Sequence, residues 1–225
     1  LEVLQKVRQS EIKTNVIMVS SHTQRGAAVT TEALQRGAFD FILKPSHGDV
    51  EENKRFLTSE LNSRLRSLTL APNAVRLATR KEVEPSRPRD TCVVPTPPPV
   101  ADGPSLPKNL DAIVIGISTG GPKALSQLIP KLPASCSVPI LIVQHMPPLF
   151  TETLAASLDR ASALSVVEAR DRVPLVGGTV YVAPGGRHLR VGGHRGNWHA
   201  EITDDPPKKS CRPSVDYLFE SAADR

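Results

Sequence analysis

The sequence predicts an α/β protein built from two incomplete, doubly wound parallel sheets that are joined by a proline-rich linker. Short runs rich in Ile and Val, such as residues 112–117 and 139–143, are bounded by turn residues, as is typical of strands buried on both faces of a sheet. Apolar residues between such runs recur at helical spacing. Residues 69–107 hold nine of the chain's 21 prolines, and this composition separates the part before them from the part after them.

Residues 1–68 are expected to alternate helices and strands. The apolar run 16–19 is followed by Ser20 and the run 39–43 is followed by Lys44, so both indicate buried strands that end in polar residues. Helices are expected before, between and after these strands, over residues 1–7, 27–36 and 49–68.

Residues 69–107 are expected to form an extended and mobile linker. They include the run Pro97-Pro98-Pro99 and few large apolar side chains, so the segment cannot bury enough surface to offset its ordering entropy. Binding of these prolines by an adaptor domain is the alternative, and a spacer is favoured over it.

Residues 108–225 open with a strand–helix–strand unit. The strands 112–117 and 139–143 flank a helix whose first turn contains Pro122. Parallel strands joined by a right-handed crossover end at the same edge of their sheet. Ser118 follows the first strand and His145 follows the second, so we expect their side chains to meet at the edge where α/β proteins place their sites.

The residues around Ser118 suit nucleophilic chemistry. The stretch GISTG, centred on Ser118, matches the G-x-S-x-G pattern of a nucleophile elbow, and His145 is placed to take the serine proton. The backbone N–H groups of Thr119, Gly120 and Gly121 lie where donors to an oxyanion are expected. A serine hydrolase is therefore favoured.

Other uses of this loop remain open from the residues alone. A nucleotide- or phosphate-binding module is the main alternative, because the glycine-rich GISTGG can also cradle a phosphate. A dinucleotide site is disfavoured, since the loop is not G-x-G-x-x-G and the second strand ends in Gln144-His145 rather than in an acidic residue.

The rest of the chain is expected to add helices over 150–158 and 213–222, a strand over 164–167, and strands with glycine-rich turns within 174–191. Thr151 is suited to cap the first of these helices. His188 lies in an expected hairpin, where a structural role is favoured over a role in the site.

Composition excludes several classes of protein. The net charge of +5 comes mainly from residues 51–110 and not from a dense basic stripe, so no nucleic-acid partner is expected. No apolar run is long enough to span a bilayer, so no membrane insertion is expected. Three cysteines without metal-ligand spacing fit reduced thiols in the cytoplasm, and no metal site is expected in the C-terminal part.

Several motifs within residues 108–225 resemble those of a known protein family. GISTGGPKAL followed by ILIVQHMP, then VYVAPGG with His188, and then RPSVD, closely resemble the catalytic domain of the chemotaxis protein-glutamate methylesterase (CheB) family. The resemblance implies hydrolysis of glutamate methyl esters on chemoreceptors and deamidation of receptor glutamines, without a cofactor. It implies Ser118 as nucleophile and His145 as general base. Some related sequences carry His where Cys211 stands, and Cys211 is left out of the predicted site.

The N-terminal part carries a second resemblance. VIMVSS and ALQRGAFDFILKP are similar to the later half of a response-regulator receiver domain. The resemblance implies that Ser20 and Lys44 sense a phosphoryl group supplied by a chemotaxis histidine kinase, and that phosphorylation regulates the esterase. The phosphoaccepting Asp and the acidic cluster that holds Mg²⁺ are expected before Leu1.

The third member of the serine–histidine triad is expected outside this chain, which is interpreted as a fragment truncated at both ends. No acid after His145 is expected to follow an apolar strand; these acids are Glu152, Asp159, Glu168, Asp171, Glu201, Asp204, Asp205, Asp216, Glu220 and Asp224. The resemblance implies an Asp in a turn beyond Arg225, so the chain as given is expected to be a poor enzyme. A catalytically inactive regulatory homologue is the remaining alternative.

Overall fold

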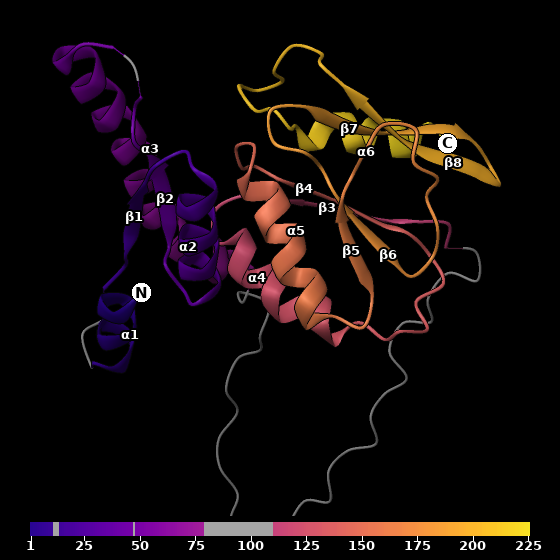
Figure 1. Ribbon diagram of the computed structural model, residues 1–225, viewed down its shortest axis with the longest axis horizontal. Helices are drawn as coiled ribbons and strands as arrows, with labels where there is room; N and C mark the ends of the chain where they lie inside the picture. Colours follow the sequence, from indigo (N-terminus) through magenta and orange to yellow (C-terminus); the bar gives the residue numbers. More distant parts are fainter. Residues whose placement is uncertain (11–13, 47, 79–109) are drawn as a thin grey trace, which may run out of the picture.

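The computed structural model describes residues 1–10, 14–46, 48–78 and 110–225. The N-terminal part (residues 1–78) and the C-terminal part (residues 110–225) lie side by side, and each contains a parallel sheet (Figure 1). Within the described residues, no helix combines the length and the apolar character that crossing a membrane requires.

The N-terminal part follows the predicted alternation. Its elements are α1 (Glu2–Gln9), β1 (Ile17–Ser20), α2 (Gln24–Gln35), β2 (Asp40–Leu43) and α3 (Val50–Ala78). Strands β1 and β2 are parallel, with Ser20 opposite Leu43 at their carboxyl ends. Helix α2 begins at Thr23, whose side chain accepts a hydrogen bond from the N–H of Gly26, and it ends just before Gly37, which has a φ of 101°.

Helix α3 is longer than the sequence predicted. It starts after Asp49, whose carboxylate accepts a hydrogen bond from the N–H of Glu52 (2.8 Å), and it continues to Ala78. The predicted end of this helix at residue 68 is therefore wrong. Residues 69–78 contain a single proline among Leu, Ala and Arg, which favour helix, whereas the prolines concentrate further along. Residues 79–107, the rest of the predicted linker, lie outside the described residues.

The C-terminal part contains a four-stranded parallel sheet in the order β3-β4-β6-β5. Its elements are β3 (Ile113–Ile117), α4 (Gly121–Leu128), a 3₁₀ turn η1 (Ile129–Lys131), β4 (Ile140–Gln144), α5 (Phe150–Ala161), β5 (Ser165–Glu168) and β6 (Thr179–Val182). These elements confirm the predicted strand–helix–strand unit. Because successive strand residues face opposite sides, β4 contributes to two cores, with Ile140 and Ile142 in one and Leu141 and Val143 in the other.

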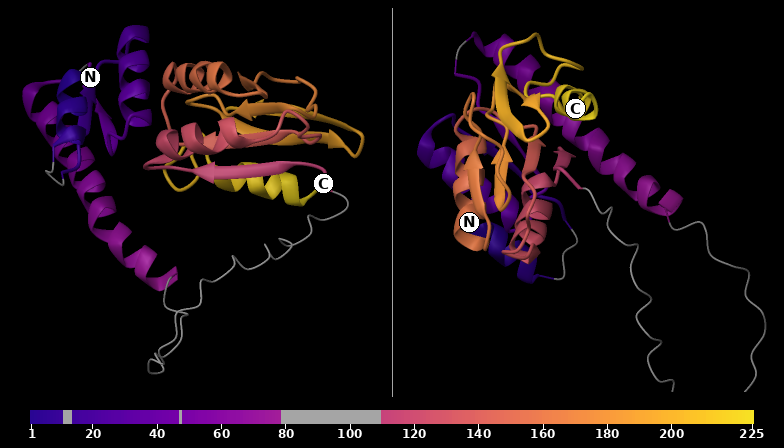
Figure 2. Two further views of the ribbon diagram at one scale, coloured as in Figure 1. Left: turned by 90° about the horizontal axis from the view of Figure 1, so that it is seen from below. Right: turned by 90° about the vertical axis from the view of Figure 1, so that its right-hand side faces the viewer.

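Helices α4 and α5 cover one face of this sheet, and a hairpin with helix α6 covers the other (Figure 2). The hairpin pairs β7 (His188–His194) with β8 (Asn197–Thr203), and α6 spans Val215–Ala223. His188 is fully buried, and its Nδ1 accepts a hydrogen bond from the N–H of Ser214 (3.1 Å). The side chain of His188 therefore ties the hairpin to the start of α6, as its predicted structural role requires.

Two details of α5 and β5 differ from the sequence predictions. Thr151 does not cap α5, which begins after Leu149. Its buried hydroxyl instead donates to Glu168 (2.6 Å) and accepts from the N–H of Gly185 (2.9 Å). Glu168 itself ends β5, so one acid does follow an apolar strand. The pairing partner of Thr151 lies in a distant strand, which local capping patterns cannot reveal.

The two parts share one hydrophobic core. Helix α2 packs against α4 and α5, and the ring of Phe41 in β2 stacks on the ring of Phe150 at a centroid distance of 4.8 Å. The hydroxyl of Ser157 in α5 also donates to Gln35 in α2 (2.9 Å). These contacts hold the N-terminal part against the edge of the C-terminal sheet at which β3 and β4 end.

Candidate active site

The structure brings Ser118 and His145 together as the sequence predicted. Ile117 lies opposite Gln144 in the parallel β3–β4 pair, so the residue that follows each strand emerges at the same edge. The Oγ atom of Ser118 lies 3.3 Å from Nδ1 of His145. This separation is within the range seen for nucleophile and base before substrate binds.

The loop after Ser118 is a tight turn. Gly120 has a φ of 76°, and the N–H of Gly121 donates to the carbonyl oxygen of Ser118 (2.8 Å). The Gly121 N–H is therefore engaged in this conformation. Within the described part of the chain, the N–H groups of Thr119 and Gly120 have no hydrogen-bond acceptor. These two donors stand free at the start of α4.

The side chain of Gln144 supports this loop, and the sequence did not predict this role. Its side chain is buried at the end of β4, and Nε2 donates to the carbonyl oxygen of Ser118 (3.0 Å). Any side chain at Gly121 would clash with the Gln144 amide. The available signal was a polar residue closing an otherwise apolar strand, since a buried amide requires hydrogen-bond partners.

The environment of His145 favours a neutral imidazole. Burial lowers the pKa of His145, and the negative charge of Asp216 raises it by less. A neutral imidazole at neutral pH can accept a proton, as a general base must. The Nε2 atom of His145 is buried and has no hydrogen-bond partner among the described residues.

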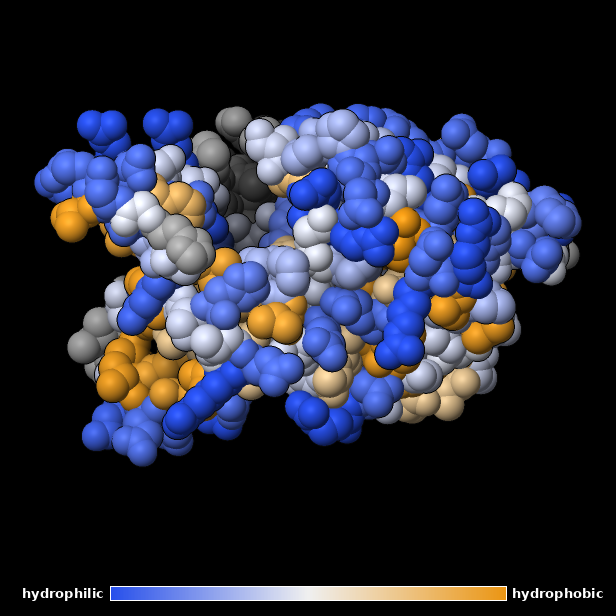
Figure 3. Space-filling model, turned by 45° about the horizontal axis from the view of Figure 1, so that its top comes forward, coloured by the Kyte–Doolittle hydropathy of each residue, from blue (hydrophilic) through white to orange (hydrophobic). Residues whose placement is uncertain are grey.

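A cleft of about 510 Å³ opens over these residues. Its floor contains Ser118, Thr119 and His145, and its opposite wall comes from β2 and α3 of the N-terminal part. The hydroxyl of Thr119 donates to the carboxylate of Asp40 in β2 (3.1 Å). Figure 3 shows the surface hollowed where the two parts meet, with mainly hydrophilic side chains around it.

Arg64 of α3 holds this wall together. Its guanidinium lies 2.6 Å from the carboxylate of Glu60 and 3.7 Å from that of Asp40. All three side chains line the cleft. The N-terminal part thus places one cation and two carboxylates opposite the serine, in an arrangement that no local sequence pattern indicated.

The predicted phosphoryl-sensing residues lie in a second, separate hollow. Ser20 and Lys44, at the ends of β1 and β2, both line a cavity of about 310 Å³. The buried Ser20 hydroxyl accepts a hydrogen bond from Thr30 of α2 (2.7 Å), and the backbone N–H of Lys44 donates to the Ser20 carbonyl oxygen (2.7 Å). The structure therefore brings the two predicted residues to one site.

Several of the acids that follow His145 pair with other groups in the described structure. Asp204 pairs with Arg187 and Asp205 pairs with Arg190, on the hairpin side of the sheet. Burial raises the pKa of Glu168, which accepts the Thr151 hydroxyl. None of the described acids hydrogen-bonds to His145.

Comparison with known proteins assigns this part of the chain to a family. The family model described as CheB methylesterase matches residues 113–225, which include Ser118, His145 and the loop between them. The chain belongs to the CheB methylesterase family.

The chain is similar to several known proteins. A protein-glutamate methylesterase/protein-glutamine glutaminase of Desulfotalea psychrophila is 38% identical over 226 residues, covering 100% of this chain and 62% of that protein. One of Symbiobacterium thermophilum is 43% identical, covering 92% of this chain and 56% of that protein. The CheB methylesterase catalytic domain of Thermotoga maritima is 42% identical, with a TM-score of 0.49, covering 51% of this chain and 60% of that one. The chain thus spans less than two thirds of each relative's length.

Proposed function

We propose that this chain carries the serine–histidine centre of a protein-glutamate methylesterase that also deamidates protein glutamines. The observation that carries the proposal is the 3.3 Å approach of Ser118 Oγ to His145 Nδ1 at a sheet edge with free N–H donors beside it. Relatives that match nearly the whole chain are named for both activities. The substrates are the γ-methyl esters of glutamates on chemoreceptor helices in the cytoplasm.

The proposed reaction proceeds in two steps. Ser118 attacks the ester carbonyl carbon while His145 accepts the hydroxyl proton, and the N–H groups of Thr119 and Gly120 stabilise the oxyanion that forms. Methanol leaves with the proton from His145, and an acyl-enzyme remains. Water, activated by His145, then releases the glutamate carboxylate and frees Ser118. With a glutamine side chain the leaving group is ammonia.

We further propose that a carboxylate from residues outside this chain completes the site. The buried Nε2 of His145 has no partner among the described residues, and an acid there would hold the imidazole and stabilise its cation. Loss of the acid from such a triad costs about 10⁴-fold in rate. A protein extended to the length of the relatives should therefore hydrolyse methyl esters far faster than residues 1–225. Equal rates would contradict this proposal.

The N-terminal part is proposed to be a receiver that restricts access to Ser118. Asp40, Phe41 and Arg64 form the wall of the cleft opposite the serine. Phosphorylation by a chemotaxis histidine kinase, with Mg²⁺ held by acidic residues outside this chain, would be sensed by Ser20 and Lys44. Ser20 bonds to Thr30 in α2, the helix that packs on α4 and α5, so a change at Ser20 has a contiguous route to the interface.

Methanol release from methylated receptor tests the proposed activity. In the extended protein, Ser118→Ala should abolish release, whereas Ser126→Ala, which removes an exposed hydroxyl of α4, should leave it unchanged. Isothermal titration with nucleotides tests the phosphate-cradle alternative. Micromolar nucleotide binding without methanol release would replace the proposed function.

A further inference from the structure

The segment that follows His145 packs closely on the loop that follows β6. Gly185 lies in this loop directly against the peptide bond that joins Pro147 to Pro148, so a side chain at position 185 would clash with that bond. The Nδ1 atom of His145 lies 3.3 Å from Oγ of Ser118, whereas its Nε2 atom has no hydrogen-bond partner among the described residues. The position of the imidazole in this structure therefore depends on the backbone segment that Gly185 supports.

A buried threonine holds Gly185 in this place. The hydroxyl oxygen of Thr151, which is fully buried at the start of α5, accepts a hydrogen bond from the N–H of Gly185 (2.9 Å). The same hydroxyl donates its proton to the carboxylate of Glu168 at the end of β5 (2.6 Å). Helix α5, strand β5 and the loop after β6 are far apart in the chain, and they meet at this one hydroxyl.

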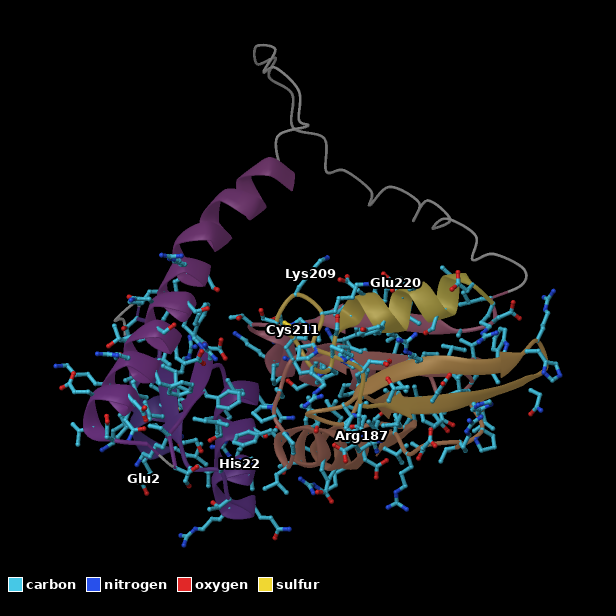
Figure 4. All side chains as sticks on the ribbon, turned by 90° about the horizontal axis from the view of Figure 1, so that it is seen from above. Glu2, His22, Arg187, Lys209, Cys211 and Glu220 are labelled. Carbon is cyan, nitrogen blue, oxygen red and sulfur yellow. The ribbon has the colours of Figure 1, made fainter. Side chains whose placement is uncertain are left out.

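The same loop also supports a second border of the cleft. The N–H of Gly186 donates to the carbonyl oxygen of Arg212 (3.3 Å), which directly follows Cys211. Pro147 and Cys211 both line the cleft. Figure 4 shows Cys211 on the side of the C-terminal part that faces the N-terminal part. One loop, fixed by the Thr151 hydroxyl, thus lies behind two segments that border the candidate active site.

We propose that Thr151 and Glu168 are positioning residues of the proposed hydrolase, and this proposal rests on the proposed function. The two side chains hold Gly185 against the segment that follows His145, and they thereby keep the imidazole within reach of the serine hydroxyl. Neither side chain is among the described residues that line the cleft, so both act through the loop and not on the substrate. A displacement of about 1 Å at a reacting group can cost about 10²-fold in rate.

Substitution of Thr151 should lower kcat with little effect on KM. Thr151→Val keeps the shape of the side chain and removes both hydrogen bonds, so in the extended protein kcat should fall by about tenfold while KM stays within about twofold. Thr151→Ser keeps the hydroxyl and should retain most of the wild-type kcat. Thr153→Val is the matched control. It makes the same substitution in the same helix and removes a hydroxyl that donates to the carbonyl oxygen of Leu149 (2.6 Å), and it should leave kcat unchanged.

Two NMR measurements on residues 1–225 follow the same contacts without depending on activity. Hydrogen exchange of the Gly185 N–H should be at least about tenfold faster in Thr151→Val, because the amide loses its acceptor. The imidazole resonances of His145, assigned by comparison with His145→Gln, should shift in Thr151→Val and stay in place in Thr153→Val. Glu168→Leu should shift them by less, because Thr151 still accepts from the amide. Glu168→Gln keeps an acceptor oxygen and should leave them in place.

Several results would overturn the proposal. Unshifted His145 resonances in folded Thr151→Val, or an equal loss of kcat in Thr153→Val, would leave Thr151 with a role in stability alone. A higher KM at unchanged kcat would place its effect on substrate binding. If Thr151→Val does not fold, unshifted resonances in Glu168→Leu decide against the proposal. Because NMR reads the protein directly, the expected shifts in a protein whose extended form releases no methanol would reject the proposed function and leave the positioning contacts standing.

Discussion

Ser118 and Ser20 occupy equivalent places in two sheets, yet their surroundings give them different chemistry. Each ends or directly follows a strand at the carboxyl edge of a parallel pair, and a polar residue, Lys44 or His145, directly follows the neighbouring strand. The Ser118 hydroxyl is exposed in a cleft and faces an imidazole at 3.3 Å. The Ser20 hydroxyl is buried and accepts a hydrogen bond from Thr30, with no base among its partners. A serine at a strand end is thus a nucleophile only where the fold also supplies a base and an open approach.

The largest effect should separate these two serines. In the extended protein, Ser118→Ala should lower methanol release by at least about 10⁴-fold, because the nucleophile and its base act as one unit. Ser20→Ala should leave the basal rate nearly unchanged and should remove activation by acetyl phosphate. A comparable loss of basal rate in Ser20→Ala would contradict the division of roles.

Substitution of Gln144 should give the second-largest effect. The Gln144 amide bonds the Ser118 carbonyl, whereas the Ser20 hydroxyl has no side-chain amide among its partners. Gln144→Leu keeps the volume but removes the hydrogen bond to the Ser118 carbonyl, so kcat should fall by about 10- to 100-fold as the serine loses its fixed position. Thermal unfolding serves as the control. If Gln144→Leu has the wild-type kcat and the wild-type midpoint of thermal unfolding, the amide does not position Ser118.

Removing a contact between the N-terminal and C-terminal parts should have a smaller effect, and it should raise the basal rate rather than lower it. Asp40→Ala removes the acceptor of the Thr119 hydroxyl and a partner of Arg64, so the basal rate should rise by about two- to fivefold if this wall restricts access. Glu32→Gln, which removes an exposed carboxylate elsewhere in the N-terminal part, is the matched control. A lower rate in Asp40→Ala would mean that Asp40 helps to bind substrate.

The pH dependence should give the smallest effect. Burial lowers the pKa of His145 below its usual value of about 6.5, so activity should stay high at neutral pH and fall only as the imidazole protonates below that value. The unfolded chain binds this proton more readily than the folded one, so the free energy of unfolding should also decline as pH falls below about 6.5. His188 contributes in the same direction, and the difference between wild type and His145→Gln isolates the His145 share.

The features that could be predicted from the sequence depend on local residue patterns and on the right-handed connection between parallel strands. The strands that end before Ser118 and His145, the helix between them and the meeting of the two side chains all followed from short apolar runs and the handedness of the connection. The prediction failed where a partner is distant in sequence. Thr151 bonds to Glu168 rather than capping its helix, and Thr119 meets Asp40 from the other part of the molecule. The length of α3 was also missed, because proline content was averaged over a segment whose first residues favour helix.

Labelling with a fluorophosphonate, followed by peptide mass spectrometry, tests the central claim most directly. The account predicts that Ser118 is the serine modified in residues 1–225, that Ser20 and Ser126 stay unmodified, and that His145→Gln slows the reaction by about tenfold or more. Modification of another serine, or an equal rate in folded His145→Gln, would contradict the assignment of Ser118 and His145 as nucleophile and base.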